Sequence, residues 1–382
     1  LQLSWGADLY NDRVRSSRRD ASAPGFQFEE RDRGNFSDNS RYTEAGLYTH
    51  GEYRFLRVGK SDFAAMLGGR LAHFSAFAPD VSDPLGDVTY DFTGLVGSAG
   101  IKYLYSTKAN AYLTWNQGFR APNLQESTVL GNTGNFFEVP NDELGPERSN
   151  TFEMGTKLDF PALGKLSASA WISLIDEKIN REEATFEGQE EIDGAPVRRR
   201  INADSAYYTG ADLEVETADV SGFNLFGFLS LVDGAVEATE ENPNFEPGPL
   251  HGLLGTADFY NNPRRLPPLT WKAGLEYSLS KKWYAQFYAQ GAGGQTKLGP
   301  GDIDDERICE TAPGVLYQDL GESCPGSSGW TTLNVRGGWA PWEFARFDLS
   351  VENLTDLRYK YHGSGPPAPG INGKLLMTLR TP

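Results

Sequence analysis

The lengths of the connections between predicted strands alternate along the whole chain, and this parity constrains the fold more than any single motif. Short connections are expected at 56–62, 107–110, 161–165, 219–222, 279–282 and 340–343. Long connections are expected at 17–40, 79–89, 127–148, 182–197, 238–265, 298–329 and 363–372. Strands that run up and down place tight turns at one rim and long loops at the other, as in transmembrane barrels. A sandwich with Greek-key crossings would break this parity.

Apolar and polar residues alternate within about fourteen segments, which is the period of a β-strand with two different faces. In 211–216, for example, Ala211, Leu213 and Val215 oppose three acidic residues. The predicted strands lie near 2–16, 41–55, 63–77, 90–106, 111–121, 149–160, 166–181, 198–217, 223–237, 266–280, 283–297, 330–340, 344–361 and 373–380. The expected fold is all-β, an antiparallel up-and-down transmembrane β-barrel, with residues 1–382 forming one barrel domain.

The composition is compatible with a barrel that has one wet face. Mean hydropathy is −0.48, and no apolar run approaches the length of a membrane-spanning helix. Low hydropathy with 43 glycines and 12% aromatic residues fits strands that expose a polar face to a lumen. Several aromatic residues are expected beside the short turns, where an interfacial girdle would lie. They are Phe55, Tyr103, Tyr105, Phe160, Trp283, Trp339 and Trp342.

The charge balance argues against a nucleic-acid partner, because a formal charge of −17 would repel phosphates. The single basic cluster is 198–200, three consecutive arginines, and we interpret it as a solvated face rather than an anion site. The chain opens directly in a strand pattern with no signal peptide, so we expect a mature chain or a fragment.

The two cysteines, Cys309 and Cys324, lie in one loop rich in Gly and Pro. Two cysteines so close together outside any strand pattern predict a disulfide that closes a loop in an oxidising compartment. The alternatives are two free thiols and, because no histidine lies near, less readily a metal site.

No catalytic constellation is present in the sequence, so the chain is not expected to be an enzyme and needs no cofactor. The four histidines are far apart and lack metal-ligand spacing. His251 is in a long loop and is a candidate ligand contact, the alternative being a solvated loop residue.

Acidic residues gather in several long loops. Oxygen-rich loops can hold Ca²⁺, and the cluster chosen as the candidate site consists of Asp302, Asp304, Asp305 and Glu306. The alternatives are solvated acids on an exposed rim, or bridging to lipopolysaccharide through divalent ions.

Five motifs, spread in order over roughly residues 110–375, resemble the TonB-dependent outer-membrane receptor family. The first is Phe119-Arg120-Ala121-Pro122, which resembles the F-R-A-P box where an upward strand ends and an extracellular loop begins. The others are Leu144-Gly145-Pro146-Glu147 running into 149–155, the segment from Asn202 to Glu214, Leu266-Pro267-Pro268, and Val351-Glu352-Asn353-Leu354-Thr355-Asp356 with Tyr359 and Pro369-Gly370.

This resemblance implies a fold and a function. Members of the family carry a plug domain inside a barrel of 22 strands. With about fourteen strands and no plug or TonB box, the chain is expected to be the C-terminal part of such a barrel, the rest being truncated or on another chain. It implies an outer-membrane receptor for a scarce bulky nutrient, siderophore-iron or a cobalamin-like chelate. A TonB-type coupling protein would act through the missing plug, and outer-membrane lipid or lipopolysaccharide would surround the barrel.

The resemblance also suggests roles for individual residues. Arg120 is expected to support the loop base through hydrogen bonds to carbonyls and carboxylates. Asn116, Asn123 and Arg120 are candidate ligand-loop residues. The loop 123–141 contains no histidine, which makes haem a less expected cargo than other chelates.

Two functions from other classes compete with this reading. A complete 14-stranded passive channel predicts that the first strand, 1–16, closes onto the last, 372–380. A soluble all-β binding or adhesive domain predicts solubility without detergent, and the turn and loop parity argues against it.

Overall fold

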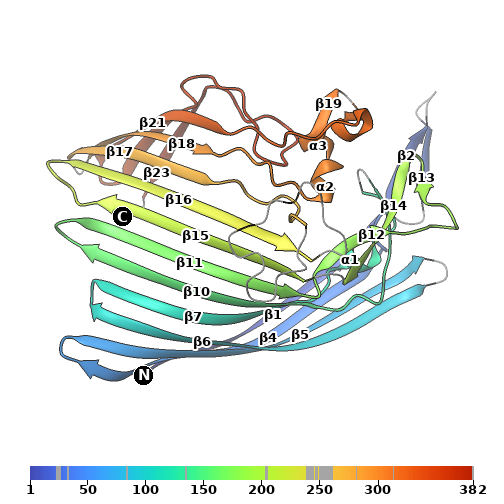
Figure 1. Cartoon of the computed structure of the whole chain (residues 1–382), viewed down its shortest axis with the longest axis horizontal. Coiled ribbons are helices and arrows are strands. Elements are labelled where there is room, and N and C mark those ends of the chain that lie inside the picture. The colour runs from blue at the N-terminus through green and yellow to red at the C-terminus, as the bar shows by residue number, and fades with distance from the viewer. Residues whose placement is uncertain are drawn as a thin grey trace.

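The computed structural model describes residues 1–22, 27–31, 34–82, 85–133, 136–202, 205–237, 245, 248, 261–280, 282–312 and 314–380. It contains one antiparallel sheet of 14 strands, each hydrogen-bonded to the next in the chain (Figure 1). They are β1 (Gln2–Val14), β4 (Ser40–Val58), β5 (Ser61–Ser82), β6 (Gly86–Ser106), β7 (Ala109–Arg120), β10 (Glu147–Phe160), β11 (Gly164–Asp176), β15 (Ala206–Thr217), β16 (Phe223–Val236), β17 (Thr270–Ser280), β18 (Trp283–Ala292), β21 (Trp330–Trp342), β22 (Ala345–Glu352) and β23 (Asn372–Leu379). The predicted up-and-down β architecture is confirmed.

The smaller elements all come from the long connections and gather at one end of the sheet, on the right in Figure 1. They are β2 (Arg18–Ser22), β3 (Gln27–Arg31), α1 (Leu124–Thr128), β8 (Gly131–Asn132), β9 (Phe137–Val139), β12 (Ile179–Glu183), β13 (Glu191–Ile192), β14 (Ala195–Asn202), α2 (Pro300–Ile303), α3 (Glu306–Cys309), β19 (Glu310–Ala312), β20 (Val315–Leu316) and η1 (Tyr317–Leu320). Among the described residues, no helix is long and apolar enough to cross a membrane.

The prediction of a long loop at 79–89 is wrong, because β5 and β6 continue through most of this range. Their ends are stabilised by a satellite core that includes Ala76, Val81 and Val88, with Leu124 of α1 packed on the same side. These strand ends are longer than predicted because α1 covers their apolar residues. An interpretation that takes each strand separately does not include this contact. The expected strand 198–217 is two strands, β14 and β15, in different sheets.

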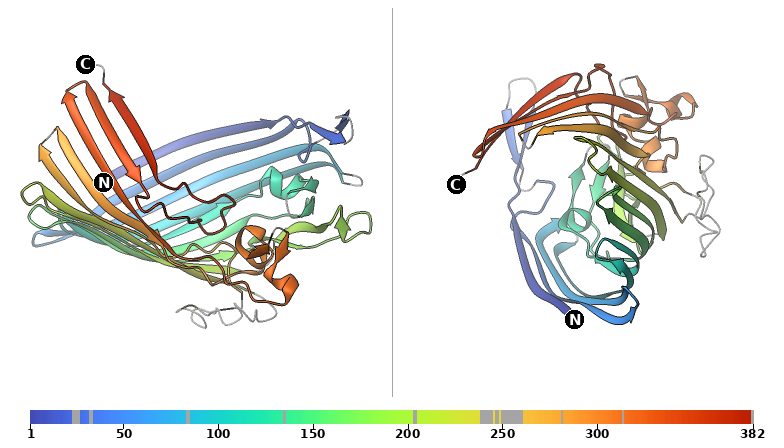
Figure 2. Two further views of the ribbon diagram at one scale, coloured as in Figure 1. Left: turned by 90° about the horizontal axis from the view of Figure 1, so that it is seen from above. Right: turned by 90° about the vertical axis from the view of Figure 1, so that its left-hand side faces the viewer.

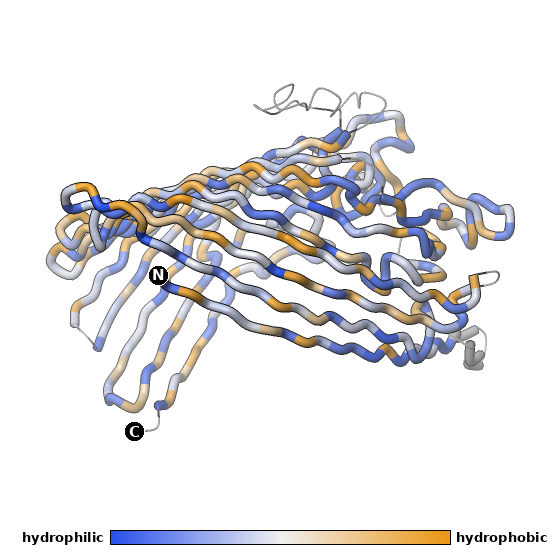
Figure 3. Tube along the Cα trace, turned by 90° about the horizontal axis from the view of Figure 1, so that it is seen from below, coloured by the Kyte–Doolittle hydropathy of each residue, from blue (hydrophilic) through white to orange (hydrophobic). Residues whose placement is uncertain are grey.

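The outward face of the main sheet is a continuous apolar band. In the register of the sheet, Leu47 lies beside Leu71, which lies beside Leu95. These side chains are 61%, 48% and 78% exposed, although they belong to one row. The alternation with polar residues is visible as orange and blue banding along the strands (Figure 3). A row of exposed leucines is expected where lipid, rather than water or protein, covers the strand face.

The other face carries paired charges. The Arg70 Nη1 atom donates to Asp8 Oδ1 over 2.7 Å, and Nη2 donates to Glu44 over 3.1 Å. Nearby, Lys102 Nζ donates to Glu52 over 2.7 Å. A wall of hydrogen-bonded charges on one face and leucines on the other is the pattern of a barrel with a polar lumen.

Aromatic side chains lie at the rim with tight turns, as the sequence predicts. Trp283 and Trp339 stack with ring centroids 5.2 Å apart, and Trp342 stacks on Phe344 at 5.6 Å. The indole rings of Trp283 and Trp342 are about half exposed. Amphipathic rings in this position suit a membrane–water interface.

The sheet curls into an open trough, with α1 on its concave side (Figure 2). Along the described strands, the pairing runs from β1 to β23 and does not join these two edges. The closure of the first strand onto the last, which the passive-channel alternative predicts, is therefore absent. The trough carries the long-loop elements at one end, and the candidate site lies there.

Candidate ligand-binding mouth at the loop end

The F-R-A-P segment turns the chain from the end of β7 into α1. Ala121 is buried against Ala72 and Phe74 of β5, which anchors the turn to the inner face of the sheet. Asn123 then caps α1: its Oδ1 accepts from the Glu126 amide at 3.0 Å, and the Glu126 carboxylate accepts from the Asn123 amide at 3.0 Å. This reciprocal capping box satisfies two amides that a short helix would otherwise leave unpaired.

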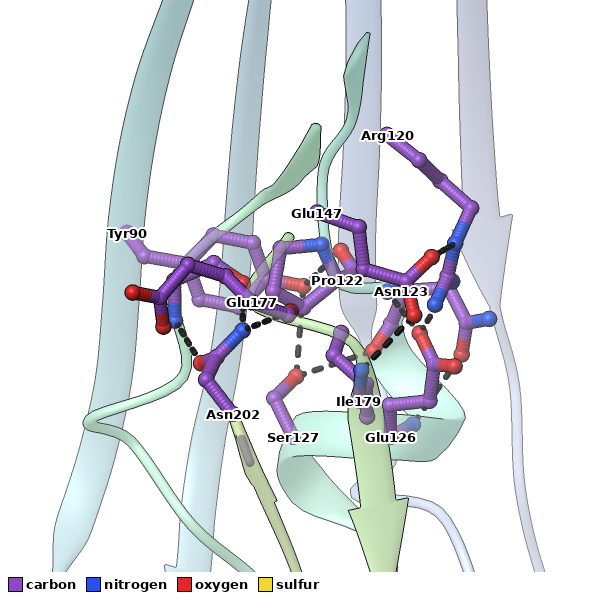
Figure 4. A network of polar contacts seen from close by, with 11 residues as sticks. Tyr90, Arg120, Pro122, Asn123, Glu126, Ser127, Glu147, Glu177, Ile179 and Asn202 are labelled. Atoms are coloured by element: carbon purple, nitrogen blue, oxygen red, sulfur yellow. Dashed lines mark hydrogen bonds and ion pairs between the residues drawn. The ribbon is translucent and has the colours of Figure 1, made fainter. Parts of the chain in front are cut away.

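Arg120 joins three segments at the base of the loops (Figure 4). Its Nε donates to Glu147 and its Nη1 donates to Glu126, each over 2.7 Å. The other oxygen of Glu147 accepts from the Ile179 amide at 2.7 Å. The hydrogen bond to Glu147 raises the pKa of Arg120 above its ordinary value. Although burial acts in the opposite direction, the bonds from Arg120 and Ile179 hold the pKa of Glu147 below its ordinary value.

Tyr90, Ser127 and Asn202 also tie this base together, and of these only Asn202 was named from the sequence. The Tyr90 hydroxyl donates to the Pro122 carbonyl at 3.0 Å, and Ser127 Oγ donates to that hydroxyl at 3.2 Å. Asn202 clamps Gly145, accepting from its amide at 2.6 Å and donating to its carbonyl at 3.0 Å (Figure 4). Tyr90 carries no sequence signal, whereas Asn202 opens one of the family-like motifs.

A second, small sheet in the order β12-β14-β9-β8 adjoins this base where the Ile179 amide of β12 donates to Glu147. Its centre is Glu138, whose side chain is 1% exposed. Arg181 Nε donates to Glu138 Oε1 at 2.6 Å, and Arg200 Nη2 donates to the same oxygen at 3.5 Å. In the arginine run, Arg198 and Arg199 pair with acids of β12. The interpretation of this run as a solvated face holds for Arg199, which is exposed, but not for Arg198 and Arg200, which are half-buried beside their acidic partners.

A pocket of about 330 Å³ opens beside the small sheet. Its lining combines an aromatic ring with both signs of charge, including Phe136, Arg181, Arg198, Glu183, Arg264 and Asp304. The guanidinium carbon atoms of Arg181 and Arg198 lie 5.3 Å and 5.9 Å from the centroid of the Phe136 ring. Such a lining can contact a bulky polar molecule through stacking and through charged hydrogen bonds.

The predicted Ca²⁺ residues are used in another way. Asp305 is 1% exposed and is contacted by Arg264, Arg265 and Arg307 at 2.9 Å, 3.2 Å and 2.6 Å. Burial acts to raise the pKa of Asp305, but the hydrogen bonds from Arg307 and Arg265 hold it well below its ordinary value. Three guanidinium groups already neutralise this carboxylate, which leaves no charge for a cation to match.

Asp302 is also buried, and both of its oxygens accept from the Arg265 amide at 3.0 Å. Asp304 accepts from Gln318 at 3.1 Å, and Glu306 starts α3. Within the described ranges, no three potential metal-binding side chains come together. The geometry therefore does not support the prediction of a calcium site at these residues.

The disulfide between Cys309 and Cys324 is present, with the two Cα atoms 5.4 Å apart. Cys309 is fully buried in a small apolar cluster with Leu298 and Ile308. The disulfide therefore fastens the loop that carries α2 and α3 to its own apolar core. His251 lies outside the residues that the structure describes.

The motif near the C-terminal end forms a side-chain-bonded turn. Asn353 is buried, with φ of 55°, and its side chain accepts from the Leu357 amide at 3.0 Å and donates to the Pro369 carbonyl at 3.2 Å. Asp356 accepts from the Ile371 amide at 2.9 Å. Leu354 is 37% exposed, and its amide donates to the Leu333 carbonyl at 2.9 Å. These residues shape the loop before β23, which is a structural role.

Two places on the concave side remain open to a ligand. Asn116 is exposed on the lumen face of β7, and its amide makes one weak contact, 3.4 Å to Thr114. Trp330, at the loop end of β21, forms an aromatic group with Tyr359 and Tyr361, with centroids 4.1 Å and 5.1 Å away. The aromatic group was not singled out as a site, because the three rings come from two distant segments.

Comparison with known proteins assigns a family. The sequence pattern described as TonB dependent receptor-like, beta-barrel, matches residues 1–354. No curated protein matches the sequence.

Solved structures share the fold at low identity. The copper transporter OprC aligns with a TM-score of 0.71 and 15% identity, over 99% of this chain and 54% of its own. The FrpB iron transporter from Neisseria meningitidis (F3-3 variant) aligns with a TM-score of 0.62 and 15% identity, over 98% of this chain and 52% of its own. The ferric-catecholate import receptor Fiu from K12 E. coli aligns with a TM-score of 0.62 and 13% identity, over 98% of this chain and 51% of its own. The chain spans about half the length of these proteins.

Proposed function

The chain belongs to the TonB-dependent receptor β-barrel family, and from this premise we propose that it forms part of an outer-membrane receptor for TonB-energised uptake of a bulky metal chelate. The observation that carries the proposal is the match over residues 1–354, which covers nearly the whole sheet. The apolar outer face and the polar inner face support membrane insertion of that sheet.

The cargo class is inferred from the loop end of the trough. The 330 Å³ pocket offers a ring and charges of both signs, and the Trp330 aromatic group offers further rings. The named neighbours are copper, iron and ferric-catecholate transporters, which supports a metal chelate over a sugar or a peptide. Siderophore-iron or a cobalamin-like chelate is the cargo we propose.

The partners follow from the same proposal. A TonB-type protein in the inner membrane would supply energy through a plug domain, and outer-membrane lipid or lipopolysaccharide would cover the leucine band. The loops of this chain would hold one side of the cargo. Because neighbours in this family are transporters, we propose no chemical reaction for the site.

Uptake measurements test the proposal against the passive channel. Cells producing the protein are given radiolabelled ferric siderophores, cupric chelate or cobalamin, with and without a protonophore. We expect saturable uptake of one class that stops when the protonophore dissipates the proton gradient. Uptake that persists with the protonophore and rises linearly with concentration would instead favour the channel.

A further inference from the structure

Two arginines on the outward face of the sheet have no ion-pair partner among the residues that the structure describes. Arg13 of β1 and Arg41 of β4 lie directly opposite each other in the strand register. Neither makes an ion pair or a hydrogen bond through its side chain within the described part of the chain, and both are exposed. Like charges directly opposite on neighbouring strands repel, so this pair opposes folding unless an anion lies between the two guanidinium groups.

The direction of the two side chains follows from their neighbours. Val14 and Tyr42 pack against the satellite cores on the concave side. Successive side chains of a strand point to opposite faces, so Arg13 and Arg41 point outward. Across the sheet, Arg41 lies beside Phe77, which is 37% exposed on the same outward face.

The pair lies just above the apolar band. On the outward face of β1, Leu9 is the last large apolar residue before the loop end, and Asn11 separates it from Arg13. Four residues of strand span about 13 Å, or about 10 Å of height for a tilted strand. The hydrocarbon core gives way to headgroups over a layer of this depth, and arginine side chains can reach back toward it.

Other charges on this face do not neutralise the pair. The two cross-strand rows nearer the apolar band contain one acidic side chain on this face among β1, β4, β5 and β6. It is Asp91 of β6, which lies two strands away from Arg41. Asp91 lies beside His73, with Nε2 and Oδ1 3.8 Å apart. In a chain of formal charge −17, two unpaired arginines at one depth are therefore a local cationic site.

We propose that Arg13 and Arg41 bind the phosphate of a glycolipid headgroup in the outer leaflet of the membrane. Two guanidinium groups on adjacent strands can each donate two hydrogen bonds to one phosphate, and Phe77 offers an apolar surface to the acyl chains beside it. Lipid is the occupant because the site continues the leucine band that lipid covers. The inference rests on the proposed outer-membrane location.

The test measures how much lipid A stays bound to protein extracted from outer membranes in mild detergent. Native mass spectrometry and a titration with fluorescent lipid A compare wild type with Arg13→Gln/Arg41→Gln. We expect the double substitution to weaken lipid A binding about tenfold or more, and dephosphorylated lipid A to bind both proteins equally weakly. Arg13→Lys/Arg41→Lys is expected to retain most of the affinity.

A matched control removes two arginines from the opposite end of β4. Arg54→Gln/Arg57→Gln makes the same change in charge beside the tight turn and is expected to leave lipid A binding unchanged. Equal lipid A binding by wild type and by Arg13→Gln/Arg41→Gln would overturn the inference, as would inorganic phosphate displacing lipid A at equal concentration. Chelate uptake is measured separately in cells, so failure there contradicts the proposed function and not the lipid contact alone.

Discussion

At the scale of single residues, Arg120 joins the end of β7 to α1 and to the start of β10 at the loop base. Replacing it with alanine leaves Glu147 half-buried without its cation and frees Glu126 of α1. We expect Arg120→Ala to cost about 1–3 kcal/mol of local stability, because hydrogen bonds to charged groups lie in this range. Limited proteolysis of loop 123–146 measures the change as faster cleavage.

Arg120→Lys is the matched control for this prediction. Lysine keeps the charge but cannot donate along two directions from a planar fork, so cleavage is expected to be intermediate. Cleavage of Arg120→Ala at the wild-type rate would show that the capping box of Asn123 and Glu126 holds the loop without the guanidinium.

Asp305 predicts an acid sensitivity in the α2–α3 loop. Its folded pKa lies below the ordinary value of 3.8, so its stabilising contribution is complete above about pH 4 and is lost as the pH falls through the folded value. We expect hydrogen exchange in 299–309 to rise below pH 3.8 in the wild type. In Asp305→Asn, exchange should already be high at pH 7 and change less with acid.

Asp304→Asn separates this effect from a general loss of charge. Asp304 makes one hydrogen bond to Gln318, so its removal should leave the acid response of the loop intact. If the two substitutions behave alike, the three arginines around Asp305 do not fasten the loop.

At the scale of elements, the disulfide and a small apolar cluster stabilise the same loop. Reduction, or Cys309→Ser/Cys324→Ser, releases a loop with a sequence separation of 15. The chain-entropy model gives about 3 kcal/mol for a loop of this length. We expect hydrogen exchange to increase in 298–328 and stay constant in β17 and β18. An increase that spreads to those strands would mean that the loop also holds the sheet.

The strands were predictable from the sequence where one face meets lipid and the other meets water. Period-two alternation placed β16 at 223–237 and the structure has it at Phe223–Val236. The alternation did not predict the strand ends correctly where tertiary contacts determine them. β5 and β6 lengthen because α1 covers Ala76 and Val88, and β17 starts at Thr270 because Pro267 and Pro268 cannot join a ladder.

The candidate site shows the same division. The expectation that Arg120 would bond loop carboxylates follows from its place at a strand end, and Glu126 lies only six residues away. Contacts between distant segments could not be predicted. Asn202 bonds to Gly145, which lies 57 residues away in the sequence, and Asp305 accepts a hydrogen bond from Arg264, which lies 41 residues away. An acidic cluster in sequence resembles a calcium loop until those arginines are placed beside it.

At the scale of the whole molecule, the two faces of the sheet require different solvents. Leu47 and His50 lie three residues apart on β4 and point to opposite faces, the first to the leucine band and the second to the lumen. Substitution by arginine can therefore be compared at two nearby positions, Leu47 on the leucine band and His50 in the lumen. A soluble domain would tolerate an arginine at Leu47 because the side chain is 61% exposed.

We expect Leu47→Arg to destabilise the folded protein in lipid vesicles by about 2–4 kcal/mol, the cost of a cation on the lipid face near the bilayer centre. His50→Arg adds charge to the polar lumen and is expected to change stability by less than about 1 kcal/mol. Reversible urea unfolding in vesicles, followed by tryptophan fluorescence, measures both. Equal effects of the two substitutions would mean that water, not lipid, covers the leucine band, and the membrane-spanning role of this sheet would then be wrong.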